Sequence, residues 1–207
     1  TLALIIGNET GAKVHITSGP ALERTGDLAA ILTNLKERDI LFIDEIHRLR
    51  PAIEEVLYTA MEDFGIDIVL GKGPSARSVR LNLPTFTLIG ATTKVSALSS
   101  PLRDRFGVVY QLQFYELSEI EKILARSARI LGVDIEEEAI QRIARSARST
   151  PRVANRLLKR VRDYAMVHDH ARVNDDSARK TLELLEVDDR GLEPMDRRIL
   201  EVIARIF

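Results

Sequence analysis

The feature that most constrains the fold is a short apolar segment that ends on two acidic residues. Residues 40–43 have the sequence Ile-Leu-Phe-Ile, and Asp44 and Glu45 follow directly. Four consecutive apolar residues are typical of a strand that is buried on both faces. Ligands of open α/β sheets bind beyond the carboxyl ends of the strands, which is where these two carboxylates would project. The alternative interpretation is a buried strand that runs into an acidic turn.

Length and composition exclude several classes of protein. The 207 residues suffice for one large domain or two small ones, and the formal net charge of −1 gives no overall basic field for nucleic acid. Any DNA contact therefore needs a local patch of positive charge. Cysteine is absent, which excludes disulfides and thiolate metal sites and fits a reducing cytosol. No apolar run approaches the ~20 residues that span a bilayer, so we expect a cytoplasmic protein without membrane contact.

The order of the predicted elements divides the chain near residue 114. Before this point, helical patterns alternate with strand patterns at 14–17, 40–43, 86–93 and 108–114, which predicts an α/β core. After it, only helical patterns remain, which predicts an all-α domain.

Three local signals refine these elements. Two alternating segments in residues 66–83 flank glycines and a proline and predict a β-hairpin. Ser118 and Glu121 have the spacing of a capping box for the first helix of the all-α part. Residues 188–191 are expected to form a linker before one further amphipathic helix.

Further candidate functional residues follow the predicted strands. Thr93 ends the strand over 86–93, where a hydroxyl can bond a γ-phosphate or cap the strand end. Arg105 lies in a turn, where its planar, permanently charged guanidinium forms surface ion pairs or reaches a nucleotide of a neighbouring subunit. Arg152 lies in the first turn of a helix that begins at Thr150 and Pro151. A cation there opposes the helix dipole and therefore needs an anionic partner.

Other motifs favour structural interpretations. Residues 71–75, Gly-Lys-Gly-Pro-Ser, lack the upstream glycine and the following helix of a phosphate-binding loop, so we interpret them as the tip of the hairpin. The four histidines include no helical pair with metal-ligand spacing, which argues against a metal site of histidines. The basic run in 156–162 is more typical of a solvated helix face than of a DNA site.

Together these motifs occur in the order found in AAA+ ATPases: Walker B, sensor I, arginine finger and sensor II. The chain resembles in particular the RuvB family, the bacterial Holliday-junction branch-migration motors, nearly from end to end. The segments that carry the resemblance are residues 17–21, 26–32, 44–48, 60–64, 71–77, 90–93 and 103–107.

The resemblance implies an architecture and a set of roles. It implies an α/β AAA+ core with a parallel sheet at 1–114, a helical lid at 115–187 and the start of a winged-helix DNA-binding domain at 188–207. With ATP and Mg²⁺ as cofactors, it assigns Mg²⁺ to Asp44, the base for the attacking water to Glu45, sensor I to Thr93, the arginine finger to Arg105 and sensor II to Arg152. The further positions that it places at the ATP site are Thr1, Glu62, Asp63, Phe64 and Tyr115, beside Arg105 and Arg152.

The resemblance also implies partners. Members of the family act as homo-hexamers on four-way junctions and duplex DNA, together with RuvA and with a RuvC-type resolvase as a further candidate. The hairpin at about 66–83 resembles the one that the family inserts against RuvA, which implies contacts from Ile66, Ile68 and Leu70. An exposed apolar face of this kind needs a partner.

One departure from the family is large. In the family a glycine-rich phosphate-binding loop directly precedes the position of Thr1, and that loop is absent here. We therefore expect a fragment that is inactive alone. Two alternatives remain open: another AAA+ ATPase such as a clamp-loader subunit, and a non-catalytic AAA+-like adaptor if the protein begins at Thr1.

Overall fold

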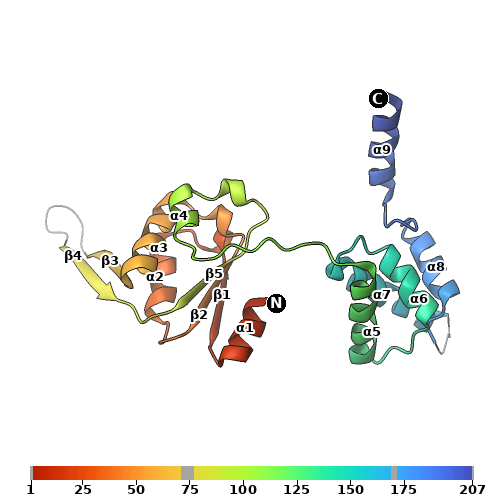
Figure 1. The fold of residues 1–207 in the computed structure, drawn as a ribbon, viewed down its shortest axis with the longest axis horizontal. Coiled ribbons are helices and arrows are strands. Elements are labelled where there is room, and N and C mark those ends of the chain that lie inside the picture. The colour runs from red at the N-terminus through yellow and green to blue at the C-terminus, as the bar shows by residue number, and fades with distance from the viewer. Residues whose placement is uncertain (1, 71–76, 169–171, 207) are drawn as a thin grey trace. The chain divides into compact units, whose positions relative to one another are not determined.

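The computed structural model describes residues 2–70, 77–168 and 172–206. The chain divides into two compact units, Thr1–Tyr110 and Gln111–Phe207, each with its own hydrophobic core. The first unit contains the described strands, and the second consists of helices (Figure 1).

A three-stranded parallel sheet forms the centre of the first unit. Its strands are β1 (Val14–Ser18), β2 (Ile40–Asp44) and β5 (Thr87–Gly90), in the order β1-β2-β5. In the register of the sheet, Asp44 lies opposite Ser18 and Ile43 lies opposite Gly90. The carboxyl ends of the three strands therefore meet at one edge, and Asp44 ends the strand that the apolar run before it predicts.

Helices cover the sheet because β2 is apolar on both faces. The helix α1 (Leu2–Thr10) lies on one side of the sheet, and α2 (Thr25–Thr33) and α3 (Pro51–Asp63) lie on the other (Figure 1). A short helix, α4 (Ser100–Asp104), follows β5. The side chains that are fully buried between the sheet and its helices include Leu28, Leu32, Leu41, Ile43 and Leu57.

The predicted hairpin is present and extends away from the sheet (Figure 1). The strands β3 (Gly65–Leu70) and β4 (Arg77–Asn82) pair antiparallel, with Ile66 opposite Leu81 and Ile68 opposite Val79. Residues 71–76, which include the predicted hairpin tip, lie outside the described residues.

The strand predicted at 108–114 is wrong. No strand or bridge includes these residues, and Tyr110 and Phe114 are 83% and 82% exposed. The apolar alternation is there, but a strand needs a partner edge for its hydrogen bonds. None of the described strands pairs with this segment.

The second unit is a helical bundle. Its elements are α5 (Leu117–Leu131), α6 (Glu137–Arg145), α7 (Pro151–Val167), α8 (Asp175–Leu184) and α9 (Pro194–Ile206). Ile120, Leu124, Ile143, Leu157 and Leu158 fill its core. None of the residues of α9 is buried, and the helix extends away from the others (Figure 1). None of the helices in the described ranges is long and apolar enough to cross a membrane.

The predicted capping box of α5 is wrong by two residues. Glu116 occupies the N-cap position, and its backbone N–H donates to the Glu119 carboxylate at 2.9 Å. Ser118 therefore lies inside the helix. The carboxylate of Glu116 takes the place of the Ser or Thr hydroxyl that the capping-box motif has at the N-cap. Gly132 ends the helix in the left-handed conformation, with φ +66°.

Candidate active site

The chain turns sharply directly after Asp44. Glu45 adopts the left-handed conformation, with φ 47° and ψ 43°, which is unfavourable for a residue with a Cβ atom. Two hydrogen bonds hold the turn: the Glu45 N–H donates to Asp44 Oδ1 at 2.9 Å, and the Ile46 N–H donates to the Ala91 carbonyl at 3.0 Å. Strained residues of this kind cluster at functional sites, so the turn marks this edge of the sheet as a candidate site.

Gly19, the first residue after the neighbouring strand β1, makes the turn possible. A Cβ atom at this position would lie 2.4 Å from the Glu45 carbonyl oxygen. Only glycine leaves room for so close an approach of two backbones. The end of β1 therefore fixes the position of the Asp44–Glu45 turn from one side, and the Ala91 segment fixes it from the other.

Asp44 suits a magnesium ion that is shared with a nucleotide. Its side chain is exposed at the edge of the sheet, and Oδ1 is engaged only with the neighbouring N–H. No group of three or more acidic or histidine side chains with metal-ligand geometry occurs among the described residues. Mg²⁺ commonly takes one or two carboxylates and completes its shell with water and phosphate oxygens, and Asp44 fits that arrangement.

Glu45 forms one weak contact. Its Oε2 lies 3.1 Å from Nη1 of Arg48, and the two side chains are 49% and 58% exposed. Ion pairs this exposed contribute little to stability, so the carboxylate is not committed to a structural role.

The two threonines after β5 differ in their environment. The Thr92 hydroxyl hydrogen-bonds His47 Nδ1 at 2.9 Å and accepts from the Lys94 N–H at 2.9 Å. Thr93 is exposed, and its hydroxyl has no hydrogen bond within the described part of the chain. Thr92 thus serves the local turn, whereas Thr93 remains available to a ligand at the edge that carries Asp44.

Arg105 is held by residues of its own chain. Its Nη2 lies 3.1 Å from the Glu62 carboxylate, its Nη1 donates to the Pro101 carbonyl at 2.9 Å, and its guanidinium carbon lies 4.6 Å from the centre of the Tyr58 ring. The Nε atom is buried and has no hydrogen-bond partner within the described residues. Arg105 is therefore a partly buried, oriented cation and not a free surface side chain.

Sequence reasoning missed Glu54 and Tyr58 beside Arg105, and it named Glu62 without linking it to Arg105. Glu54, Tyr58 and Glu62 are four residues apart on α3, which places them on one face of the helix. The four-residue spacing indicates that these side chains share one face of the helix, but it does not indicate that Arg105 packs against that face. Burial raises the pKa of Tyr58, and the Glu54 carboxylate acts in the same direction.

The positions 62–64 do not lie beside Asp44 in this chain. They end α3, and the Phe64 carbonyl accepts from the Leu83 N–H as the chain returns toward the amino end of β5. Asp63 forms an ion pair with Arg80 at 2.9 Å, and Phe64 packs edge-to-face on Phe86 with 6.1 Å between ring centres. They therefore face the end of the sheet opposite the Asp44 turn.

The hairpin residues expected to contact a partner are not equivalent. The expectation for Ile66 is wrong, because its side chain is only 1% exposed and belongs to the core of the first unit. Ile68 is partly buried, and the side chain of Leu70 lies outside the description. Val79, opposite Ile68, is 39% exposed and offers apolar surface that the sequence did not single out.

Arg152 and Tyr115 belong to the second unit. Arg152 is exposed in the first turn of α7 and lines a depression of about 590 Å³ together with Arg156, Lys159 and Arg160. Tyr115 is 45% exposed, and its N–H donates to the Ser149 carbonyl at 3.4 Å. Thr1 lies outside the described residues.

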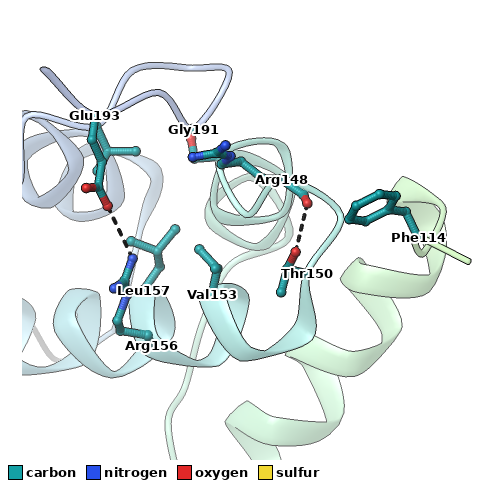
Figure 2. Close-up of a pocket in the computed structure, with 10 residues that line it drawn as sticks. Phe114, Arg148, Thr150, Val153, Arg156, Leu157, Gly191 and Glu193 are labelled. Carbon is teal, nitrogen blue, oxygen red and sulfur yellow. Dashed lines mark hydrogen bonds and ion pairs between the residues drawn. The ribbon is translucent and has the colours of Figure 1, made fainter. Parts of the chain in front are cut away.

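A smaller pocket of about 330 Å³ adjoins the same helix start (Figure 2). Figure 2 shows Arg156 directed toward Glu193, at 3.4 Å. The second arginine of this pocket, Arg148, is paired with Asp196 at 3.0 Å. Both cations are therefore matched by carboxylates, and within this unit Arg152 is the better candidate for a phosphate.

Two families match the chain. The one described as the Holliday junction DNA helicase RuvB P-loop domain matches residues 1–112, and the RuvB AAA lid domain matches residues 115–188. The Holliday junction branch migration complex subunit RuvB of Chloroflexus aggregans is 58% identical over 207 residues, which are 100% of this chain and 59% of that protein.

Solved structures agree with these matches. The Thermotoga maritima RuvB Holliday junction branch migration motor is 47% identical with a TM-score of 0.86, and a single-site mutant of it is 48% identical with a TM-score of 0.89. Each comparison covers 99% of this chain and 64% of the other. The chain thus spans about three fifths of the length of these relatives. The matches support RuvB and not a clamp loader, and the chain belongs to the RuvB family of AAA+ proteins.

Proposed function

We propose that this chain is the motor part of a hexameric ATPase that drives branch migration of Holliday junctions in the cytoplasm. The names of its relatives support this activity, and a RuvA-type partner and junction DNA follow from it. Residues 1–114 serve as the nucleotide-binding core, 115–187 as the lid, and 188–207 as the start of a DNA-binding winged-helix domain.

One observation carries the proposal: Asp44, Glu45 and Thr93 follow the carboxyl ends of two adjacent parallel strands. Asp44 would hold a magnesium ion together with the nucleotide, and the ion would supply positive charge to the phosphates. Glu45 orients the attacking water and accepts its proton, and the Thr93 hydroxyl bonds the same water or the γ-phosphate. Arg152 and Tyr115 contact the nucleotide from the lid.

Arg105 serves the nucleotide of an adjacent subunit. Its guanidinium is paired with Glu62 in the last turn of α3, toward the end of the sheet opposite Asp44. A cation held there is poorly placed for the site of its own chain. In trans it would stabilise the charge that develops on the transferred phosphoryl group.

Mixing two inactive variants of the full-length protein tests both assignments. Glu45→Gln keeps nucleotide binding but loses hydrolysis, since an amide cannot take the proton. Arg105→Ala lowers turnover by roughly 10³–10⁵-fold, the range for arginine fingers. In mixed rings, an interface that pairs Glu45 of one variant with Arg105 of the other is complete. We therefore expect ATPase activity to return on mixing.

Arg103→Ala is the matched control. Arg103 lies two residues from Arg105, and its one side-chain contact within the described residues is with Ser100, whose hydroxyl is 3.4 Å from Nη2. Its loss should leave turnover within about twofold of the wild type, as for other exposed substitutions. If freshly co-assembled rings of the two inactive variants stay inactive while added wild-type subunits still function in them, Arg105 acts within its own chain.

A further inference from the structure

The surroundings of Arg105 are built by one face of α3. Glu54, Tyr58 and Glu62 occupy successive turns of this helix, and each contacts the segment that begins at Ser99 and carries Arg105. Tyr58 and Glu62 contact the Arg105 guanidinium directly, whereas Glu54 contacts Ser99 at the start of the segment. Two successive turns of a rigid helix therefore hold the guanidinium, whereas an exposed ion pair holds it with a single mobile side chain.

The first of the three α3 residues, Glu54, is a buried carboxylate that contacts two hydroxyl groups. Glu54 is 7% exposed, and its Oε2 accepts from the Tyr58 hydroxyl at 2.9 Å and from the Ser99 hydroxyl at 2.5 Å. The two hydroxyls lie 2.8 Å apart. A buried carboxylate is costly unless hydrogen bonds satisfy it, so the three groups form a strongly coupled set. We call Glu54, Tyr58 and Ser99 the Arg105 cradle.

The cradle is connected to Arg105 along two routes. Ser99 is the N-cap of α4, where its hydroxyl accepts from the Leu102 N–H at 3.3 Å, and Arg105 is the residue that ends this helix. The Tyr58 ring, fixed by its hydroxyl, lies under the guanidinium at 4.6 Å. A cation over an aromatic face is attracted by it, and a fixed ring therefore fixes the direction of the cation.

We infer that Glu54 and Tyr58 are positioning residues that aim Arg105 at the nucleotide of the adjacent subunit. The inference rests on the proposed role of Arg105 in trans. It adds that the cradle of a subunit affects hydrolysis only through the arginine that this subunit donates to its neighbour. A cradle defect therefore impairs hydrolysis in the neighbour and leaves the nucleotide site of its own subunit intact.

Substitutions in the full-length protein separate positioning from general stability. Tyr58→Leu removes the ring, Tyr58→Phe removes only the hydroxyl, and Glu54→Gln removes the charge but keeps an acceptor. Displacement of a catalytic group by about 1 Å costs up to ~10²-fold, so we expect turnover to fall by about tenfold to a hundredfold in Tyr58→Leu. Tyr58→Phe and Glu54→Gln should fall between this variant and the wild type, and the KM for ATP should stay unchanged in all three.

Glu55→Gln is the matched control for Glu54→Gln. It makes the same chemical change one residue further along α3, on an exposed side chain that has no hydrogen bond or ion pair within the described residues. Its turnover should equal that of the wild type. Ring assembly by size-exclusion chromatography and far-UV circular dichroism show whether each variant is folded. Should Tyr58→Leu fail to fold, Tyr58→Phe and Glu54→Gln still decide the question by their turnover.

Mixed rings test the direction in which the cradle acts. Tyr58→Leu mixed with Glu45→Gln should regain ATPase activity, because one interface then has an intact donor and an intact acceptor. Tyr58→Leu mixed with Arg105→Ala should gain nothing, because both defects lie on the donor side. Recovery in the second mixture, or wild-type turnover in the cradle variants, overturns the inference. If Arg105→Ala itself keeps full turnover, the trans role of Arg105 fails instead, so the two failures are distinguishable.

Discussion

At the scale of single residues, the buried carboxylate of Asp39 stabilises the segment directly before β2. It is 6% exposed, and its Oδ2 accepts from the Lys36 N–H at 3.0 Å and contacts His15 Nε2 at 2.8 Å. The hydrogen bond from the Lys36 backbone is the largest cause that lowers the pKa of Asp39, and His15 adds to it against the opposing effect of burial. The ionised form is therefore the one that the fold stabilises.

This environment predicts a dependence of stability on pH. Because the pKa of Asp39 in the folded protein lies below the ordinary value of 3.8, the carboxylate stabilises the fold above that pH. The stabilisation is lost as the pH falls through the folded pKa. We expect Asp39→Asn to lower the free energy of unfolding by about 1–3 kcal/mol at neutral pH and by less below pH 3.8. Urea titrations across this range measure it, and an equal loss at every pH contradicts it.

The site residues differ in how far the sequence predicts them. The location of Asp44 follows from the apolar run before it, because that run forms a buried strand and ligands bind beyond strand ends. The environment of Arg105 does not follow from any local pattern. It depends on the approach of Ser99 to Tyr58, residues far apart in the chain, and on burial of Glu54.

At the scale of elements, the hairpin separates a core role from a surface role. Ile66 is buried, and Val79 on the paired strand is exposed. Ile66→Ala should lower the free energy of unfolding by about 2–5 kcal/mol, as for other large-to-small changes in cores. Denaturant titration of the full-length protein measures this loss. A change below 1 kcal/mol would mean that neighbouring side chains move into the space that Ile66 leaves.

Val79→Ser should leave stability nearly unchanged and weaken the association of the full-length protein with RuvA, because it removes exposed apolar surface. Titration calorimetry with purified RuvA measures the effect, and intrinsic ATPase activity serves as the control. Unchanged RuvA affinity in Val79→Ser and in Ile68→Ser together assigns the partner surface to another element.

The sequence predicts an element well where a local pattern determines its structure, and poorly where pairing with a distant segment determines it. The helix α7 begins at Pro151 as expected, because proline fits the first helical position. Residues 108–114 have the alternation of a strand and form none, since no described edge pairs with them. The start of α5 was displaced because Glu116 caps it in place of a hydroxyl residue.

At the scale of the whole molecule, the two units differ in how their contacts are distributed along the chain. In the first unit, Ile40 pairs with Thr87 across an intervening helix and hairpin. In the second, the helices α5 to α8 pack around a single core, and helices in contact are separated by at most one other helix. Folds rich in local contacts form faster than sheets with distant partners, so the second unit should fold first.

Single tryptophans provide a test, because the chain has none. Phe86→Trp reports on the first unit, where Phe86 packs on Phe64, and Tyr164→Trp reports on the second, where Tyr164 stacks on His168 at 4.0 Å. In stopped-flow refolding, we expect the signal at position 164 to be at least about tenfold faster. Equal rates at the two positions would show that the units fold as one.

The distant pairing of β2 and β5 has a consequence during synthesis on the ribosome. Elongation proceeds at about 5–20 residues per second, so the segment that pairs with β2 emerges roughly 2–10 s after it. Throughout this interval one edge of an apolar strand, from Ile40 to Ile43, is without its neighbour. Unpaired edges of this kind invite pairing with other nascent chains. We therefore expect chaperones to protect the sheet that presents Asp44 during synthesis, and slower translation lengthens its exposure.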